Sequence, residues 1–381
     1  MKLSGAWIDA SATQRVCASL TDQGYQALFV GGCVRNALLN VPVSDIDIAT
    51  DAEPEMILKC AEQAHLKAIP TGIDHGTITV VCEGVAHEIT TFRADTETDG
   101  RHAKVRFSTD VIEDAARRDF TMNAIYAQAD GTVIDPLAGM PDLKKRLVRF
   151  IGDPYARIRE DYLRSLRFFR FTAWYGDPAL GIDADGLAAI AENIDGLAGL
   201  SRERVGTELK KLFFAQEPTQ AVAAMRASGV LSAVLAEPDD RALGPLIHLE
   251  QMVDKMPDSI RRLAAIATAD NAERLRFSKA DKKRWAVLRD EVGDMKSAGH
   301  LGQIYGAHVA QDILLLRAAL LEMPFDAKAM SEAKTGENAV FPIKAKDLAP
   351  LEGRDLGAKL KELEAIWVTS QFTLSKEELL G

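Results

Sequence analysis

Strand-like and helix-like segments mix in the first 150 residues, whereas the rest of the chain is patterned almost wholly as helix. The segments QALFV (26–30) and TITVVCEG (77–84) are rich in β-branched and apolar residues, as strands are. From about residue 155 onward, apolar residues recur at three- and four-residue spacing, the period of an amphipathic helix. Asp153-Pro154 marks the break between the two patterns. The change of pattern predicts an α+β protein, with a small mixed β-sheet domain over residues 1–150 and an all-helical remainder.

Hydropathy and cysteine usage exclude several classes of protein. No apolar run approaches the roughly 18 residues of a membrane span, and the first ten residues lack the apolar core of a secretory signal. The four cysteines form no Cys-x-x-Cys pair, so neither a zinc site nor a disulfide framework is indicated. We expect a protein with no membrane segment, at home in the reducing cytoplasm. Nothing in the sequence bears on its oligomeric state.

The segment FVGGCVRNALLNVPVSDIDIAT (29–50) combines a glycine turn with two acids. Gly31-Gly32 and Arg35 lie where a strand passes into a helix, an arrangement that lets the backbone approach a phosphate and favours negative charge. In an extended segment, Asp45 and Asp47 project from the same face, with Ile46 and Ile48 toward the core. Two adjacent carboxylates suit a hard cation such as Mg²⁺, which also takes oxygens from a triphosphate. The alternative is a solvent-facing loop with two unremarkable acids.

A third carboxylate, Glu88, lies in the strand-like segment AHEITTFR (86–93), after an expected hairpin at Glu83-Gly84. If this strand lies beside the Asp45–Asp47 strand, Glu88 completes the acidic site, through a hydrogen bond or by helping to activate an attacking hydroxyl. The alternative is a surface glutamate on an edge strand.

The segment DAARRDFTMNA (114–124) contains two adjacent arginines followed by an acid. Arg117 and Arg118 have the chemistry to clamp phosphates or fix a ribose, with Asp119 orienting an arginine. A salt bridge at a helix end is the alternative.

The segment REDYLRSLRFFRF (159–171) predicts one charged ridge on a helix, since Asp161, Arg164, Arg167 and Arg170 follow successive three-residue steps. An aspartate accepts a hydrogen bond from an exocyclic amine, and an arginine donates one to a ring nitrogen. Cytosine and adenine both present an amine beside an unprotonated ring nitrogen, whereas uracil and guanine present the reverse pattern. One Asp161/Arg164 pair therefore has the pattern to accept CTP and ATP and to reject UTP and GTP. A surface salt-bridge ladder is the alternative.

A stretch of the helical remainder is basic although the whole chain has a formal net charge of −10. RNA responds to a local patch rather than to the total charge, so this stretch is a candidate RNA contact. The alternative is a solvated helical face. The candidate RNA-binding residues in it are Arg261, Arg262, Lys282, Lys283 and Arg284.

Together these motifs resemble the class II tRNA nucleotidyltransferases (CCA-adding enzymes) and their relatives, the bacterial poly(A) polymerases. The resemblance covers about residues 29–215. It implies a nucleotidyltransferase head (1–150), a helical neck that reads the base (151–215), and a helical body and tail that bind RNA (216–381). The matching segments, in the family's order, are GGCVR, DIDIAT, GIDHGTITV, HEITTFR, DAARRDFTMNAIY, EDYLRSLRFFRF and SRERVGTELKKLF.

The resemblance also implies an activity: template-independent addition of CCA to the 3′ end of tRNA, with CTP and ATP as substrates and Mg²⁺ as cofactor. Asp45 and Asp47 would bind the metal, with Glu88 as the third catalytic acid. The implied nucleotide-binding residues are Gly31, Gly32, Arg35, Arg117, Arg118, Asp119, Asp161, Arg164, Arg167 and Arg170.

Two segments depart from the family's pattern. Asn36 stands where the GGxVR block usually continues with aspartate. The polar stretch 95–104, which we expect to be a mobile loop, lies in a region (94–106) that lacks the usual Tyr…Arg-Arg-Pro. In this family that loop influences the change from C to A addition, so the exact product stays open. The alternatives are a poly(A) polymerase, an enzyme that adds only CC or only A, and an inactive RNA-binding scaffold.

Overall fold

The computed structural model describes residues 1–98 and 103–381. The chain divides into two compact units, each described here by itself. The first consists of Met1–Arg204 with Gln220–Val234, and the second of Val205–Thr219 with Leu235–Gly381. The predicted boundaries at residues 150 and 215 stay a prediction.

A mixed sheet forms the centre of the N-terminal part. Within the described residues it has seven strands in the order β3-β4-β5-β2-β1-β8-β9. The β2–β5 pair is parallel, whereas the other neighbours run antiparallel. The strands are β1 (Leu28–Val30), β2 (Ile46–Thr50), β3 (Lys67–Gly72), β4 (Thr77–Cys82), β5 (Val85–Thr91), β8 (Tyr126–Gln128) and β9 (Val133–Ile134).

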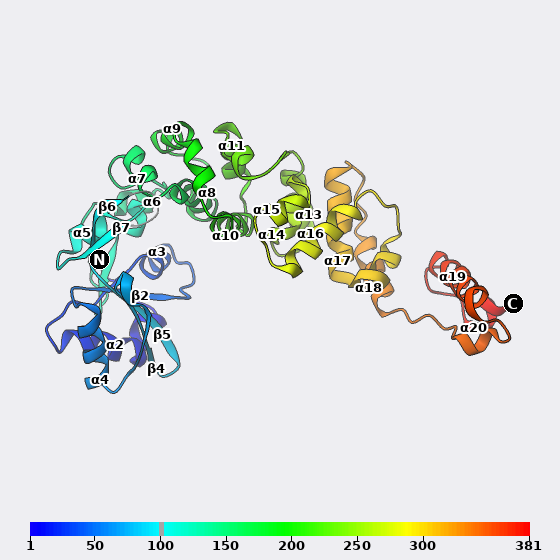
Figure 1. The fold of residues 1–381 in the computed structure, drawn as a ribbon, viewed down its shortest axis with the longest axis horizontal. Coiled ribbons are helices and arrows are strands. Elements are labelled where there is room, and N and C mark those ends of the chain that lie inside the picture. Colours follow the sequence, from blue (N-terminus) through cyan, green and yellow to red (C-terminus); the bar gives the residue numbers. More distant parts are fainter. Residues whose placement is uncertain (99–102) are drawn as a thin grey trace. The chain divides into compact units, whose positions relative to one another are not determined.

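Alternation along the strands buries one set of side chains against helices. Ile46 and Ile48 are buried, as the sequence predicts for the residues that alternate with the aspartates, and Ile89 beside Glu88 is buried as well. Helices α2 (Ser11–Thr21) and α4 (Pro54–Gln63) pack against β4 and β5 (Figure 1). The expected hairpin joins those two strands, with Glu83 and Gly84 both at positive φ. The shorter helices of this part are α1 (Ala6–Asp9), α3 (Gly32–Leu38), η1 (Ile73–His75), α5 (Val111–Ala116), η2 (Thr121–Asn123) and α6 (Met140–Lys144).

The polar stretch 95–104 is not simply a loop, which corrects the prediction. Strands β6 (Arg93–Thr98) and β7 (Ala103–Phe107) pair antiparallel and make a separate two-stranded ribbon. Residues 99–102 of the predicted loop lie outside the described part of the chain. The sequence did not predict these two strands because its polar residues and glycine are typical of a loop.

Helices follow from residue 154, and an aromatic cluster ties the second of them to the sheet domain. Asp153 caps α7 with its side chain and Pro154 occupies the first turn, so the helix begins at the predicted break. Phe168 and Phe171 are buried, as predicted, and the Phe150 and Phe168 rings stack with centroids 5.4 Å apart. The helices of this region are α7 (Pro154–Glu160), α8 (Leu163–Tyr175), α9 (Ala184–Glu192), η3 (Ile194–Gly199), α10 (Arg202–Phe213), α11 (Thr219–Ala227) and α12 (Val230–Val234).

The second unit is helical throughout, which together with the mixed sheet confirms the predicted α+β class. In the described residues, no helix combines the length and apolar character needed to cross a membrane. The helices of the second unit after residue 235 are α13 (Leu243–Met252), α14 (Ser259–Ile266), α15 (Asp270–Arg274), α16 (Lys279–Asp290), α17 (Ala298–Leu320), α18 (Lys328–Asn338), η4 (Ala345–Leu348), α19 (Gly353–Thr369) and α20 (Lys376–Leu380).

Candidate active site

The three candidate carboxylates gather where β2 and β5 run side by side. The parallel register sets Asp47 directly opposite Glu88, which meets the condition under which Glu88 joins the two aspartates, and Asp45 immediately precedes β2. Asp47 is half-buried, whereas Asp45 and Glu88 are exposed. Burial and the charges of Glu88 and Asp45 raise the pKa of Asp47 to about 6, against the opposing effect of nearby guanidinium groups. The cluster is therefore short of positive charge.

The glycine turn lies against this cluster. Gly31 has φ of 70°, a left-handed conformation that favours glycine, and it comes directly before α3. A Cβ built on Gly31 would lie 3.6 Å from Arg118 Nη1 and 3.9 Å from Asp47 Oδ2. The turn thus brings bare backbone close to both an arginine and an acid. Gly32 begins α3 and lies near Arg35.

One buried carboxylate, Asp114, holds both adjacent arginines. Its side chain is 1% exposed and pairs with Arg117 at 2.8 Å and with Arg118 at 2.9 Å. The Tyr126 hydroxyl donates to the same carboxylate at 2.8 Å. Burial raises the pKa of Asp114, but the two arginines and Tyr126 outweigh it and lower that pKa to about 2. Asp114 is therefore ionised and fixes the arginine pair. Arg117 and Arg118 follow it by three and four residues, the spacing at which side chains meet on a helix.

A second network connects Arg35 to α8. Arg35 donates to Asn123 Oδ1 at 2.6 Å and to the Tyr175 hydroxyl at 2.8 Å. The Asn123 amide donates to Asp119 Oδ1 at 2.8 Å, and Arg167 donates to Asp119 Oδ2 at 2.6 Å. Burial of Asp119 raises its pKa, yet Arg167 and Asn123 outweigh that effect and the pKa is lowered. Asp119 thus orients an arginine, namely Arg167.

Arg35 itself is buried, which lowers the pKa of its guanidinium although Tyr175 acts in the opposite direction. Its guanidinium lies 4.0 Å from the centre of the Tyr175 ring. It also donates to Asn36 Oδ1 at 2.9 Å, while the Asn36 amide donates to the Pro42 carbonyl at 2.9 Å. Aspartate at position 36 would lose the second bond. Asn36 therefore holds the connection between α3 and β2.

The predicted continuous ridge from Asp161 to Arg170 is wrong. The helix breaks at Asp161-Tyr162, with Asp161 extended at φ of −151° after α7, so only Arg164, Arg167 and Arg170 share α8. Asp161 Oδ1 accepts from the Leu163 backbone at 3.1 Å, which starts α8. Its Oδ2 accepts from Arg204 at 2.8 Å. Local capping by the aspartate competed successfully with helix continuation.

Arg164 and Arg170 of α8 are both half-buried. Arg164 donates to Glu160 at 2.5 Å, to the Arg157 carbonyl at 2.9 Å and to the Arg117 carbonyl at 3.0 Å. Through Arg117, Arg164 is connected to Asp114 and Arg118, and hence to Asp47. Arg170 lies over the Phe171 ring, 4.4 Å from its centre. The structure therefore connects Arg164, through the Arg117 main chain, to the Asp114 carboxylate that holds Arg117 and Arg118.

Comparison with known proteins identifies the family. Residues 27–149 match the poly A polymerase head domain, and residues 180–240 match the probable RNA and SrmB-binding site of polymerase A. The chain is 34% identical over 380 residues to the mitochondrial CCA tRNA nucleotidyltransferase 1 of Danio rerio, covering 94% of this chain and 86% of that one. It is 33% identical over 371 residues to a CCA-adding enzyme of Bacillus licheniformis, covering 95% of this chain and 91% of that one. This chain belongs to the class II tRNA nucleotidyltransferase and poly(A) polymerase family.

The structure agrees with that assignment. The crystal structure of the Bacillus stearothermophilus CCA-adding enzyme in complex with CTP matches with a TM-score of 0.71 and 26% identity, covering 94% of this chain and 93% of that one. A Thermotoga maritima CCA-adding enzyme complexed with tRNA shares the fold, with a TM-score of 0.72 and 17% identity over 96% of this chain and 92% of that one.

Enzymes of this family generally depend on a divalent metal, and the carboxylates fit one. In the described part of the chain, no three His, Cys, Asp or Glu side chains form a ready metal cage. A magnesium-type ion does not require such a cage, because it is commonly held by one or two carboxylates together with water and substrate phosphate. Asp47 lies near the carboxylates of Asp45 and Glu88, whose charges raise its pKa, and a bound cation would offset their repulsion. Asp45 and Asp47 are therefore suitable oxygen ligands.

Reasoning from the sequence missed several residues that orient the candidate side chains. All but Tyr175 lie within the quoted motifs, but only the pairs of Asp114 with Arg117 and Arg118, and of Glu160 with Arg164, have a spacing that signals their role. The others come from distant positions that only the fold brings together. The residues missed are Asp114, Asn123, Tyr126, Glu160, Tyr175 and Arg204.

The predicted RNA-binding arginines are a further correction. Arg261 and Arg262 are 0% and 1% exposed. Arg261 pairs with Glu250 and Asp312, and Arg262 pairs with Glu250. Arg284 is held by Asp258 and Asp312. Pairing with acids that the local sequence does not reveal keeps Arg261 and Arg262 buried and Arg284 half-buried.

The lysines of the same stretch lie outside that cluster. Lys282 pairs with Glu273 at 2.5 Å and is partly exposed, and Lys283 is exposed. These two remain accessible to a nucleic acid.

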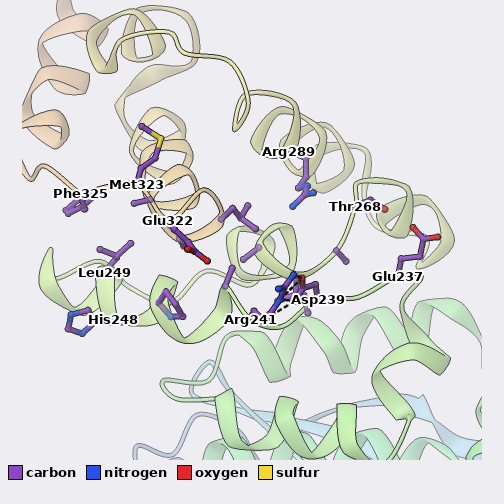
Figure 2. A pocket seen from close by; sticks show the side chains of 18 residues that line it. Glu237, Asp239, Arg241, His248, Leu249, Thr268, Arg289, Glu322, Met323 and Phe325 are labelled. Atoms are coloured by element: carbon purple, nitrogen blue, oxygen red, sulfur yellow. Dashed lines mark hydrogen bonds and ion pairs between the residues drawn. The ribbon is translucent and has the colours of Figure 1, made fainter.

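A cavity of about 620 Å³ lies in the second unit. Residues of α13, α14, α16 and α17 line it, and Figure 2 shows Arg241 paired with Asp239 among them. None of the candidate site residues lines this cavity.

Proposed function

We propose that this chain adds CCA to the 3′ end of tRNA, using CTP and ATP and releasing pyrophosphate without a nucleic-acid template. The observation that carries the proposal is Asp47 set opposite Glu88 and beside Arg118, in a chain related to CCA-adding enzymes over 94% of its length. The 3′-hydroxyl of the RNA attacks the α-phosphate of the incoming nucleotide. The four cysteines are buried and unpaired, in keeping with a reducing cytoplasm.

The acidic cluster is the proposed magnesium site, with Asp45 and Asp47 as ligands. What the bound ion supplies is acidification of the attacking hydroxyl and neutralisation of the leaving phosphates. Glu88 faces Asp47 across the strand pair and is exposed, so its carboxylate is placed to accept a hydrogen bond from a group entering the site.

The glycine turn and the arginine pair form the proposed triphosphate site. Gly31 and Gly32 let phosphate oxygens approach the backbone, because no Cβ stands between Arg118 and Asp47. Asp114 keeps Arg117 and Arg118 aimed, so less conformational entropy is lost when they bind phosphate. Arg35 contributes positive charge from behind the turn, while its own donors hold Asn36, Asn123 and Tyr175 in place.

Asp161 and Arg164 are the proposed readers of the base, with Arg167 and Arg170 beside them. The Asp161 carboxylate has more lone pairs than its bonds to Leu163 and Arg204 use. The three bonds from Arg164 use three of the five N–H donors of a guanidinium. Both side chains thus retain capacity to pair with cytosine or adenine while their protein contacts hold them in position.

The two lysines of the basic stretch, the partly exposed Lys282 and the exposed Lys283, are the proposed RNA contacts of the second unit. They would act through backbone charge, which is how duplex RNA is mostly held. The buried Arg261 and Arg262 have a structural role instead.

The test compares the parent protein with Asp47→Asn, measuring magnesium-dependent incorporation of labelled CMP into tRNA that lacks its CCA end. We expect incorporation to fall by about a thousandfold or more, because the substituted amide carries no charge for the cation, with tRNA binding retained. Asp51→Asn, just beyond the same strand, is the matched control and should retain activity. Full activity of Asp47→Asn would refute the metal assignment.

A further inference from the structure

The arginine face of α8 ends in an exposed tryptophan. Seven residues make almost two full helical turns, so Trp174 returns to within about 20° of Arg167 on the helix surface. Arg170 lies on the same side of α8, one turn before Trp174. Trp174 is 42% exposed, whereas Trp285 and Trp367 are buried and Trp7 is half-buried. A large aromatic ring is thus partly exposed to solvent on the face that carries the site's arginines.

The surroundings of Trp174 combine aromatic rings with positive charge. Its ring lies 6.4 Å from that of Tyr175, with an interplanar angle of 38°. Tyr175 in turn accepts the hydrogen bond from Arg35 and underlies its guanidinium. Arg170 lies over Phe171. Aromatic rings on which bases stack, next to cations that follow the phosphates, are the usual means of holding single-stranded nucleic acid.

The position of Trp174 along α8 determines which base it can meet. Ten residues separate Arg164 from Trp174, about 15 Å along the helix axis. A single nucleotide whose base pairs with Arg164 does not reach Trp174 with that same base. The ring is therefore available to a different nucleotide, one that already belongs to the RNA strand.

We propose that Trp174 stacks on a base in the unpaired 3′ end of the RNA substrate, with Arg170 beside it to meet the RNA backbone. Stacking is tolerant of base identity, because every base has a π-face. A strand that changes its terminal nucleotide with each addition needs such tolerance. The inference rests on the proposed function, since it names a contact of the RNA that the enzyme extends.

A kinetic comparison of Trp174→Ala with the parent protein tests the contact. We expect the KM for tRNA to rise about tenfold, the loss of roughly one stacked base, with kcat and the KM for CTP unchanged. Trp174→Phe keeps a ring and should lie near the parent value. Leu180→Ala, which removes another exposed apolar side chain of the first unit, is the control and should change neither constant. An unchanged KM for tRNA in Trp174→Ala, or a rise confined to the KM for CTP, would overturn the inference.

Fluorescence tests the same contact without turnover. Adding tRNA that lacks CCA, in the absence of CTP, should quench the tryptophan emission of the parent protein, and Trp174→Phe should lose most of that quenching. Equal quenching in both proteins at saturating tRNA would overturn the proposal. Because this readout needs no catalysis, a parent protein that binds tRNA but incorporates no nucleotide would refute the proposed function separately.

Discussion

At the scale of single residues, the arginines beside the acidic cluster depend on Asp114. This carboxylate is almost fully buried and is shared by Arg117, Arg118 and the Tyr126 hydroxyl. Its lowered pKa means that it stays ionised at any pH at which the protein works. Charge and geometry at the proposed triphosphate site therefore depend on a residue that touches no substrate in our account.

Replacing Asp114 by asparagine should impair both stability and nucleotide binding. Two half-buried guanidinium groups would lose their counter-ion, and breaking such pairs costs about 3 to 5 kcal/mol. Displaced arginines should also lower kcat/KM for CTP by about a hundredfold. Thermal unfolding and steady-state kinetics measure the two effects. Asp110→Asn, in the exposed cap of the same helix, should leave both nearly unchanged because asparagine caps as well as aspartate. Equal behaviour of the two variants would contradict the role of Asp114.

Asp47 gives the metal-free protein a pH dependence of stability. Burial and the charge of Glu88 raise its native pKa from the ordinary 3.8 to about 6, so the native state binds the proton more tightly than the unfolded state. The free energy of unfolding should then fall as pH rises from about 4 to 6. Above that range it should no longer change, because Asp47 is ionised in both states.

Asp47→Asn removes the ionisable group and with it the penalty. In a chelator, the variant should be more stable than the parent at pH 8, by up to about 3 kcal/mol, and the difference should shrink toward pH 4. Denaturant unfolding at both pH values measures this. A stability difference that does not change with pH would show that burial and neighbouring charges do not raise the pKa of Asp47.

At the scale of elements, the junction between α7 and α8 determines how the proposed base readers are presented. Asp161 lies in the break, where its carboxylate starts α8 and accepts from Arg204. Arg164 lies in the first turn of α8 and is held by Glu160 at the end of α7. The break therefore sets the acid and the arginine at different angles from those of a continuous helix.

Base selection should weaken when the acid is removed. Asp161→Ala should reduce the preference for CTP over UTP, measured as the ratio of kcat/KM values, by at least about tenfold, because uracil would no longer face a mismatched acceptor. Arg204→Ala keeps the Asp161 carboxylate and should keep the preference. Undiminished discrimination in Asp161→Ala would assign base reading to other groups.

The same elements show what the sequence could and could not reveal. Alternation was enough to put Asp45 and Asp47 on one face of their strand, because side-chain direction in a strand follows from position alone. That the Glu88 strand pairs with this one was only a condition in the sequence analysis, since strand order depends on the whole sheet. The break at Asp161 was not predictable from spacing, since its neighbours Tyr162 and Leu163 read equally well as helix. Arg261 was misplaced because its acidic partners, Glu250 and Asp312, lie 11 and 51 residues away.

At the scale of the whole molecule, a buried ionic cluster connects the helices of the second unit. Asp312 of α17 accepts from Arg261 of α14 at 2.7 Å and from Arg284 of α16 at 2.5 Å. Lys255 approaches the same carboxylate at 3.0 Å. Burial raises the pKa of Asp312, but these cations outweigh it and the pKa is lowered. Arg261 and Arg284 of the basic stretch therefore hold helices of the second unit together.

Asp312→Asn should leave these cations without their counter-ion and lower the free energy of unfolding of the second unit by about 3 to 5 kcal/mol. The emission of Trp285, buried in α16, reports that unit during unfolding. Asp290→Asn, an exposed change on α16, should have little effect. A stable Asp312→Asn variant would contradict the structural role given to the cluster.

The product made by the intact chain tests the central claim most directly. Purified protein, magnesium and tRNA ending at the discriminator base would be incubated with each nucleotide alone and with CTP and ATP together, and the 3′ ends sequenced. We predict that the tRNA gains CCA and then stops, and that neither UTP nor GTP is used. A long A tail, a product that ends at CC, or no extension of a tRNA that still binds would contradict the account.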